Sequence, residues 1–336
     1  MGLAMKALVR APFAEQSVQR LGRKLDVTYE PWIEERRLYG PGEMAERIQK
    51  EDIAILVVEA DFLSKELFEA PNLKLAGVCR NALNQVDLEA ATRRGVPVIF
   101  TPNRNTTSVA ELAINFMLML GRHIPQASSY VVDGKWTNPM DAYIGFRGRE
   151  VSGSVVGIVG LGQIGSQVAK RARALGARVI AHDPYVNPRR ARSLGVRLVS
   201  LRQLLRRADF VTFHTPLTGR TEPLVDGAAM DLMMPTAYLI NTGAANILDY
   251  DALEERLRTK RIAGAALDVF PGFALDKESK LPELDNVILT PHIGGATEET
   301  IVRQSRMIVD DIERFLSGKR PMRMANPDAL PAPHGR

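Results

Sequence analysis

The chain has 336 residues, more than a single hydrophobic core usually supports, so two domains are expected. Hydrophobic residues make up 45% and charged residues 25% of it, which excludes a fibrous or disordered chain. The formal net charge of +5 arises from 44 basic and 39 acidic residues, and the basic clusters lack interleaved aromatic residues. Nucleic acid is therefore not an expected partner.

Cysteine content and hydropathy indicate the compartment. Cys79 is the only cysteine, which excludes an intrachain disulfide and fits a reducing environment. No uninterrupted apolar run approaches the roughly 20 residues that span a membrane, and the first residues lack the apolar stretch of a signal peptide. We therefore expect a cytoplasmic protein without membrane contact.

Short apolar runs alternate with amphipathic segments in the first third of the chain. Residues 6–9, 53–58 and 73–79 are predicted to be strands, and residues 42–51 and 86–95 are predicted to be helices. Alternation of this kind predicts a parallel sheet with crossover helices.

The same pattern restarts after residue 150 and predicts a second parallel sheet. Its expected strands are 155–160, 177–183, 208–214, 237–242, 262–270 and 286–292. A long apolar helix is expected from about Thr107 to Val131, and another from about Glu298 to Phe315. These helices suggest a discontinuous first domain (1–103 plus 298–336) and an inserted second domain (104–297). The tail, 321–336, is rich in proline and polar residues and is expected to be loosely ordered.

A glycine motif opens the second domain. Gly160, Gly162 and Gly165 have G-x-G-x-x-G spacing between a predicted strand and a predicted helix. In this motif the first glycine permits a tight turn, the second lets a pyrophosphate approach the backbone, and the third allows close helix packing. The helix N-terminus supplies free amides and partial positive charge for the phosphates. This context predicts a dinucleotide site.

Asp183 closes the next predicted strand, about 20 residues downstream, where a carboxylate accepts hydrogen bonds from ribose hydroxyls. It also repels a 2′-phosphate, which favours NAD over NADP. Arg189 and Arg190 lie nearby in sequence and could hold such a phosphate, but the carboxylate at the strand end normally decides the preference.

Several further strings occur in unbroken order over residues 50–318: LEAATRRGVPV, NRNTTSVAEL, HTPLTGRTE, GAALDVF and ILTPHIGGAT. With the glycine motif, they resemble the D-isomer-specific 2-hydroxyacid dehydrogenases. The resemblance implies two Rossmann-like α/β domains, with the NAD-binding domain inserted into a flavodoxin-like substrate domain. It also implies an active-site cleft between the domains and a homodimer formed mainly by the cofactor domains.

The resemblance assigns the family's acid/base histidine to His292, in TPHIGGAT. Imidazole suits this task because its unperturbed pKa, about 6.5, lies near neutrality. Two other catalytic positions differ from the family. Ala244 stands where the family has its carboxylate-binding arginine, and Phe273 stands where it has the glutamate that pairs with the histidine. Asp276 and Glu278 are near enough in sequence to be considered as a replacement carboxylate.

A methyl group cannot form the bidentate bonds by which a guanidinium binds a carboxylate. A small anionic substrate would then need another anchor, and Arg80, in GVCRNA (77–82), is the first candidate, with Asn81 beside it. Arg104 and Asn105 are second candidates. Each of these residues could equally be a solvated loop residue.

For NAD, the resemblance carries over to further positions beyond the three glycines and Asp183: Gln163 and Ile164 at the pyrophosphate turn, Thr215 and Pro216 near the adenine, and Thr242, Gly243 and Asp268 around the nicotinamide. No metal-ligand spacing is present, and no metal is expected.

Three functions remain open on this sequence. The first is an NAD-dependent oxidoreductase that acts on an atypical hydroxy acid or sugar acid, with His292 as acid/base. The second is a catalytically silent NAD-binding sensor or regulatory protein, which Ala244 and Phe273 favour. The third is an enzyme that recycles NAD internally during isomerisation, decarboxylation or elimination.

Overall fold

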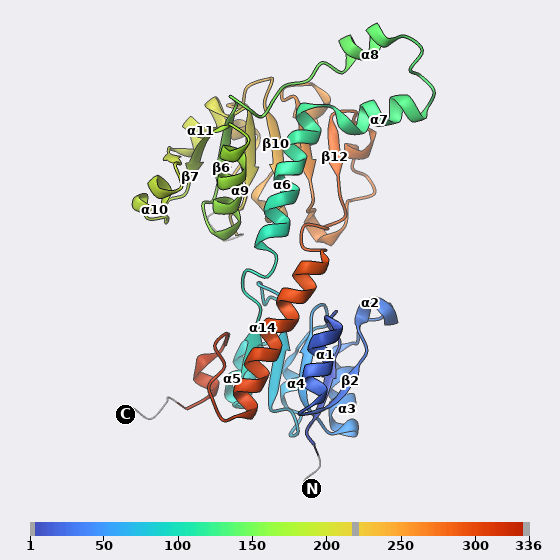
Figure 1. Cartoon of the computed structure of the whole chain (residues 1–336), viewed down its shortest axis with the longest axis vertical. Helices are drawn as coiled ribbons and strands as arrows, with labels where there is room; N and C mark the ends of the chain where they lie inside the picture. The colour runs from blue at the N-terminus through green and yellow to red at the C-terminus, as the bar shows by residue number, and fades with distance from the viewer. Residues whose placement is uncertain (1–3, 217–221, 332–336) are drawn as a thin grey trace. The chain divides into compact units, whose positions relative to one another are not determined.

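The computed structural model describes residues 4–216 and 222–331. The chain divides into two compact units. Unit 1 combines residues 1–104 with 297–336, and unit 2 is the contiguous stretch 105–296 (Figure 1). No helix among the described residues is long and apolar enough to cross a membrane.

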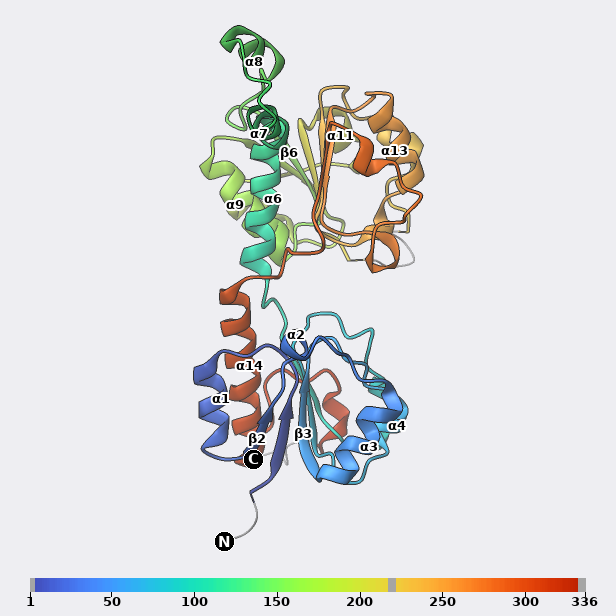
Figure 2. The ribbon, with the colours of Figure 1, turned by 90° about the vertical axis from the view of Figure 1, so that its right-hand side faces the viewer.

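Unit 1 is built on a five-stranded parallel sheet with the order β2-β1-β3-β4-β5, the flavodoxin-like arrangement. Its strands are β1 (Lys6–Val9), β2 (Asp26–Tyr29), β3 (Ile53–Val58), β4 (Leu75–Val78) and β5 (Val98–Phe100). Its helices are α1 (Glu15–Gly22), α2 (Trp32–Glu35), α3 (Pro41–Glu51), α4 (Lys65–Phe68), α5 (Leu88–Arg93) and α14 (Glu298–Leu316). Figure 2 shows α1 and α14 on one face of the sheet and α3 and α4 on the other. The strands in the middle of this sheet are buried on both faces, as expected for continuous apolar runs.

The C-terminal segment is ordered where the structure describes it, so the expectation of a loose tail is wrong up to residue 331. Met324 forms an antiparallel bridge with Ile99 of the edge strand β5. The buried side chain of Asn326 accepts a 2.7 Å bond from the Val98 amide and donates a 3.0 Å bond to the Val96 carbonyl. The segment thus supplies hydrogen-bond partners for the backbone of the edge strand β5. The proline content of the segment alone did not indicate this order.

Unit 2 contains a seven-stranded parallel sheet with the order β12-β11-β10-β9-β6-β7-β8. The chain order reverses between β6 and β9, as in a Rossmann fold. The strands are β6 (Val155–Val159), β7 (Arg178–His182), β8 (Arg197–Leu198), β9 (Phe210–Phe213), β10 (Tyr238–Asn241), β11 (Gly264–Leu267) and β12 (Val287–Leu289). The predicted fold class, two Rossmann-like α/β domains, is confirmed.

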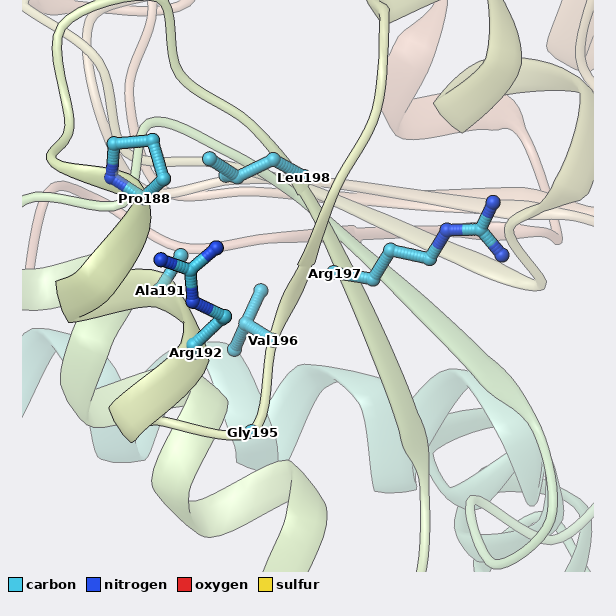
Figure 3. A pocket seen from close by; sticks show the side chains of 7 residues that line it. All are labelled: Pro188, Ala191, Arg192, Gly195, Val196, Arg197 and Leu198. Carbon is cyan, nitrogen blue, oxygen red and sulfur yellow. The ribbon is translucent and has the colours of Figure 1, made fainter.

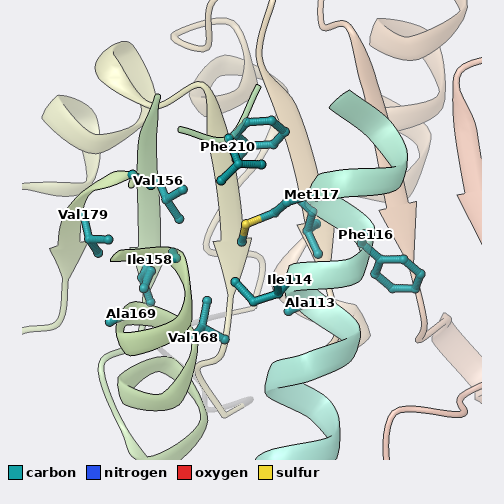
Figure 4. Packing of buried hydrophobic residues seen from close by; sticks show 14 of the residues in the cluster. Ala113, Ile114, Phe116, Met117, Val156, Ile158, Val168, Ala169, Val179 and Phe210 are labelled. Carbon is teal, nitrogen blue, oxygen red and sulfur yellow. The ribbon is translucent and has the colours of Figure 1, made fainter. Parts of the chain in front are cut away.

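Helices cover both faces of the sheet of unit 2: α6 (Thr106–Gly121), α9 (Gln163–Ala174), α10 (Pro188–Ser193), α11 (Leu201–Arg207), α12 (Gly227–Met230) and α13 (Tyr250–Arg258). Two further helices, α7 (Ile124–Val132) and α8 (Pro139–Gly145), have no buried residues. Figure 4 shows α6 and α9 packing on β6, β7 and β9 through Met117, Val168 and Phe210. Short 3₁₀ turns lie at Ala245–Ile247, Pro271–Phe273 and Leu281–Glu283, and one in unit 1 at Pro327–Ala329.

The single helix expected over 107–131 is wrong. The structure breaks it into α6 and α7 at His123, whose φ is +52°. Pro125 lies in the first turn of α7. Proline lacks the amide that a continuous helix would need there and clashes with the carbonyl four residues earlier, so the chain must turn.

Candidate functional site

The glycine-rich turn after β6 has the geometry that its spacing predicts. Gly160 has φ +90°, and a Cβ there would lie 2.8 Å from the His214 carbonyl oxygen. A Cβ on Gly165 would lie 2.0 Å from the Gly160 carbonyl oxygen. Gly162, by contrast, faces open space, with nothing within 4 Å of a Cβ. Two glycines therefore permit close packing, and the third leaves the turn accessible to a ligand.

Helix α9 starts at this turn, with Gly162 as its N-cap and no side chain capping its amides. Gln163 is exposed, while Ile164 packs against the core and fixes the helix on the sheet. Free amides at the N-terminus of a helix of this length bind phosphate groups. This end of α9 can therefore hold a pyrophosphate.

Asp183 follows β7 and ties the glycine-rich turn to that strand. Its Oδ2 accepts a 2.8 Å bond from the Leu161 amide, and its Oδ1 accepts bonds of 2.9 and 3.0 Å from the amides of Tyr185 and Val186. A carboxylate has about four acceptor positions, so capacity remains for a ribose hydroxyl.

Residues after β9 and β10 meet at the same edge of the sheet. A Cβ on Gly243 would lie 3.0 Å from the Phe213 carbonyl oxygen. Thr242 is buried, and its hydroxyl has no partner among the described residues. An unpaired buried hydroxyl at the same edge of the sheet as the glycine-rich turn fits a bound dinucleotide, whose riboses could supply the missing bond. Thr215 is half-buried and Pro216 exposed, and residues 217–221 lie outside the described part of the chain.

Asn241, which the sequence did not single out, shapes the loop after β10. Its fully buried side chain accepts a 3.0 Å bond from the Gly243 amide and donates a 3.1 Å bond to the Ala244 carbonyl. Ala244 packs against the apolar cluster that also includes Tyr250. The position assigned to the family's arginine is therefore apolar. The side chain of Phe273 lies outside what the structure describes.

His292 stands on a loop held by Asp268. The buried Asp268 carboxylate accepts bonds from the Thr290 hydroxyl (2.6 Å) and from the amides of Ile293 and Gly294 (both 2.8 Å). His292 has φ +55°, and its amide donates a 3.0 Å bond to the Thr290 carbonyl. The imidazole is exposed within this loop. Asp268, expected at the nicotinamide, thus uses its oxygens to present the histidine.

Within the described part of the chain, neither acidic residue considered as a replacement partner forms a hydrogen bond or ion pair with His292. Asp276 is exposed and accepts a 2.9 Å bond from the Glu278 amide, and Glu278 is also exposed. Asn105 does lie beside the histidine loop: a Cβ on Gly295 would be 3.2 Å from its Nδ2. Asn105 is the candidate for substrate binding that belongs to unit 2.

In unit 1 the residues after β3, β4 and β5 bring three charged groups together. Arg104 forms a 2.7 Å ion pair with Glu59 and also donates to Gln304. The side chain of Arg80 has no hydrogen bond or ion pair with any described residue. Burial lowers the pKa of Arg80, an effect that Glu59 opposes and Arg104 reinforces. A half-buried guanidinium without an acceptor is suited to bind an anion, whereas Arg104 is already paired.

Asn81, the neighbour of Arg80, is exposed, and its Oδ1 accepts a 3.3 Å bond from the Asn103 amide. Asn103 has φ +62°, so this bond supports a strained turn. Arg190 donates a 3.2 Å bond to the Ser166 hydroxyl on α9, while Arg189 is exposed.

A surface cavity of about 410 Å³ lies at α10 and β8 (Figure 3). Pro188, Ala191, Arg192 and Val196 line it, and no predicted site residue does. The described residues contain no group of three or more His, Cys, Asp or Glu that could hold a metal ion.

Comparison with known proteins agrees with this geometry. Residues 114–294 match the family model "D-isomer specific 2-hydroxyacid dehydrogenase, NAD binding domain". The chain belongs to the D-isomer-specific 2-hydroxyacid dehydrogenase family. Unit 2 carries the NAD-binding domain of this family, so NAD is its cofactor.

The relatives to which the chain is similar carry the names of different enzymes. A D-3-phosphoglycerate dehydrogenase of Methanocaldococcus jannaschii is 34% identical over 97% of this chain and 60% of its own length. A glyoxylate reductase of Thermococcus litoralis is 34% identical over 86% of this chain and 88% of its own length. The chain spans 47–60% of the length of the first phosphoglycerate dehydrogenases it matches. The crystal structure of the TT0316 protein from Thermus thermophilus superposes with a TM-score of 0.84 at 32% identity, covering 96% of this chain and 100% of that one.

Proposed function

We propose that this protein is an NAD-dependent oxidoreductase that acts on the CH–OH group of a small anionic hydroxy acid or sugar acid. The observation that carries this proposal is the loop bonded to Asp268, which presents an exposed His292 in the same unit as an accessible glycine-rich turn. NAD held at this turn would supply the hydride chemistry of the reaction. His292 holds or releases the proton at the substrate oxygen.

The substrate carboxylate needs a cation, and Arg80 is the proposed anchor. Its guanidinium has no partner among the described residues, while Ala244 supplies only a methyl group. Asn81 and Asn105 are proposed as hydrogen-bonding groups for the substrate. Because the family's arginine position is apolar, the substrate is expected to be atypical for the family.

A silent NAD-binding sensor is the second candidate, because Ala244 sits in an apolar setting that cannot hold an anion. The partner that we propose in either case is a second copy of the chain. Helices α7 and α8 and their connection expose a cluster of large apolar side chains, with Val132 82% and Tyr143 75% exposed. A cluster of this size on a protein surface is typical of an interface.

The test combines NADH titration with absorbance at the reduced-nicotinamide band over a panel of 2-oxo and 2-hydroxy acids. His292→Ala should lower kcat by about 10²- to 10⁴-fold. The control is His123→Ala, at the other histidine of unit 2 whose backbone has a positive φ, and it should leave kcat unchanged. Arg80→Gln should raise KM, with partial rescue in Arg80→Lys.

NADH binding without turnover on any panel member, with activity appearing in Ala244→Arg, would overturn the oxidoreductase in favour of the sensor. NAD-dependent conversion without net NADH formation would instead indicate internal recycling of the cofactor.

A further inference from the structure

The stretch 170–207 of unit 2 is strongly basic. It contains eleven lysine and arginine residues and a single acidic residue, Asp183, whereas acidic residues outnumber basic ones in the rest of the chain. The Asp183 carboxylate is bonded to three backbone amides. Of the eleven basic residues, only Arg171 forms an ion pair with a described residue, Glu111. The stretch therefore carries a positive charge that is largely uncompensated, and such a surface attracts anions.

The cavity of about 410 Å³ at α10 and β8 lies within this basic stretch. Apolar surface lines its interior, because Ala191 and Val196 are buried and Leu198 is half-buried. Figure 3 shows Leu198 turned toward Pro188, with the side chain of Arg192 beside Ala191 and Val196. The volume is in the usual range for a binding pocket. The cavity thus offers an apolar space next to a guanidinium group.

The strand at this cavity, β8, has an open edge. It is the last strand in the sheet order, and it pairs only with β7 among the described strands. The Val199 amide donates a 2.9 Å bond to the Ala181 carbonyl of β7. Successive amides of a strand point to opposite sides, so the Leu198 amide lies on the open side. An edge of this kind can pair with an additional strand.

An extended peptide would use the charge, the cavity and the open edge together. A strand added beside β8 alternates its side chains between the two faces of the sheet. On the α10 face, one apolar side chain can enter the cavity near Arg192. On the other face, its neighbours can reach Arg197, whose side chain extends away from the cavity in Figure 3.

The charge determines which peptide this edge accepts. Arginines along an edge repel a basic strand and find no partner on a neutral one, so they select an acidic strand. A small anion would leave the strand edge unused. A nucleic acid would leave the apolar cavity unused, and residues 187–207 contain no aromatic side chain on which its bases could stack.

We propose that α10 and β8 bind an acidic, extended segment of another protein, which pairs with β8 and inserts an apolar side chain into the cavity. No residue assigned to NAD or to the substrate lines this cavity. The inference therefore goes beyond the proposed function and does not depend on it. It gives the enzyme a surface by which an acidic partner can hold it.

Fluorescence anisotropy with a labelled peptide of aspartate and glutamate around one central leucine tests the proposal on the unmodified protein. Replacing the leucine by serine should weaken binding about tenfold, because the cavity then lacks its apolar occupant. Methylation of alternate peptide amides, which prevents strand pairing, should also weaken binding about tenfold. Both comparisons change only the peptide, so they do not depend on the folding of a substituted protein.

A double variant tests the charges. Arg192→Gln with Arg197→Gln should bind the leucine peptide roughly three- to tenfold more weakly at low salt, as expected for two exposed ion pairs. Arg258→Gln with Arg306→Gln removes the same charge at two other exposed arginines, and this control should retain the affinity. Both double variants should bind NADH as the unmodified protein does, which shows that unit 2 is folded.

Hydrogen exchange locates the bound peptide. Residues 196–199 should exchange more slowly in its presence, because the open edge of β8 becomes paired. Absence of peptide binding, equal affinity for the leucine and serine peptides, or unchanged exchange at β8 would overturn the proposal. Tighter binding of a single-stranded oligonucleotide of equal charge would overturn it in favour of a nucleic-acid surface.

Discussion

Gly165 and Gly162 belong to one motif but meet different surroundings. A methyl group at residue 165 would overlap the Gly160 carbonyl oxygen, whereas one at residue 162 meets nothing within 4 Å. We expect Gly165→Ala to lower the free energy of unfolding by about 1–3 kcal/mol, as overpacking does. Gly162→Ala should fold normally and bind NADH more weakly, because its methyl group enters the space left for the pyrophosphate.

Urea unfolding and NADH titration of the two variants measure these effects separately. Gly22→Ala, with open space at the end of α1, serves as the control, which should leave NADH affinity unchanged and should not lower the free energy of unfolding. Equal NADH affinity of Gly162→Ala and the unmodified protein would contradict the placement of the pyrophosphate.

Asp268 gives a second prediction at this scale. Its carboxylate accepts bonds from two consecutive amides after His292, and an asparagine would turn its own NH₂ group toward one of these donors. Asp268→Asn should therefore lose about 1.5–3 kcal/mol of unfolding free energy, the usual contribution of a hydrogen bond to a charged group. Denaturation at neutral pH measures this, with the exposed Asp251→Asn as control. Unchanged stability would mean that the loop does not depend on Asp268.

The sequence could predict residues whose role depends on local spacing. The three glycines and Asp183 lie within one strand-turn-helix-strand unit, so their geometry follows from short-range order. The role of Asp268 could not be predicted in this way, because its partners lie 22–26 positions away and their contact depends on the pairing of β11 with β12. The contact between Asn105 and Gly295 joins still more distant positions.

At the scale of elements, continuous apolar runs predicted the central strands, and the predicted bounds of β3, Ile53–Val58, match those observed. The strands β2, β5 and β8 were not predicted. Each is short and lies at a sheet edge, and β2 and β8 are also exposed or half-buried. Edge strands carry a weak hydrophobic signal for this reason. The break at Pro125 was missed because the apolar pattern continues through it.

The segment from α7 to α8 yields the prediction at this scale. Val132 and Tyr143 expose their apolar surface there, in the part of unit 2 that Figure 1 draws away from the sheet. A charge on this surface would remain unpaired in an interface between two copies. We expect Val132→Glu combined with Tyr143→Glu to convert a dimer into monomers.

Sedimentation velocity measures the change of mass. Met322→Glu, at a residue of unit 1 that is 58% exposed, is the matched control and should leave the mass unchanged. A dimer that persists in the double variant would place the interface elsewhere.

At the scale of the whole molecule, NADH should stabilise the two units unequally. The predicted dinucleotide contacts belong to unit 2, so at 100 times its Kd the ligand should add about 2.7 kcal/mol to the stability of that unit. Hydrogen exchange followed by mass spectrometry should show slower exchange in peptides of β6 and β9 and unchanged exchange in those of β1 and β3. Equal protection of both units would mean that they open together.

Unit 1 is formed by two separate stretches of the chain, and this affects the order in which the protein folds during synthesis on the ribosome. Its sheet is complete once β5 has emerged, but Ile308, Val309 and Ile312 of α14, which cover one face of that sheet, are made only after all of unit 2. At about 5–20 residues per second, this leaves the nascent sheet with an uncovered apolar face for roughly 10–40 s. Unit 2, a continuous stretch, can close its core within that interval. The unit whose sheet is made first is therefore the last to finish folding, and it is the unit that a nascent-chain chaperone would need to shield.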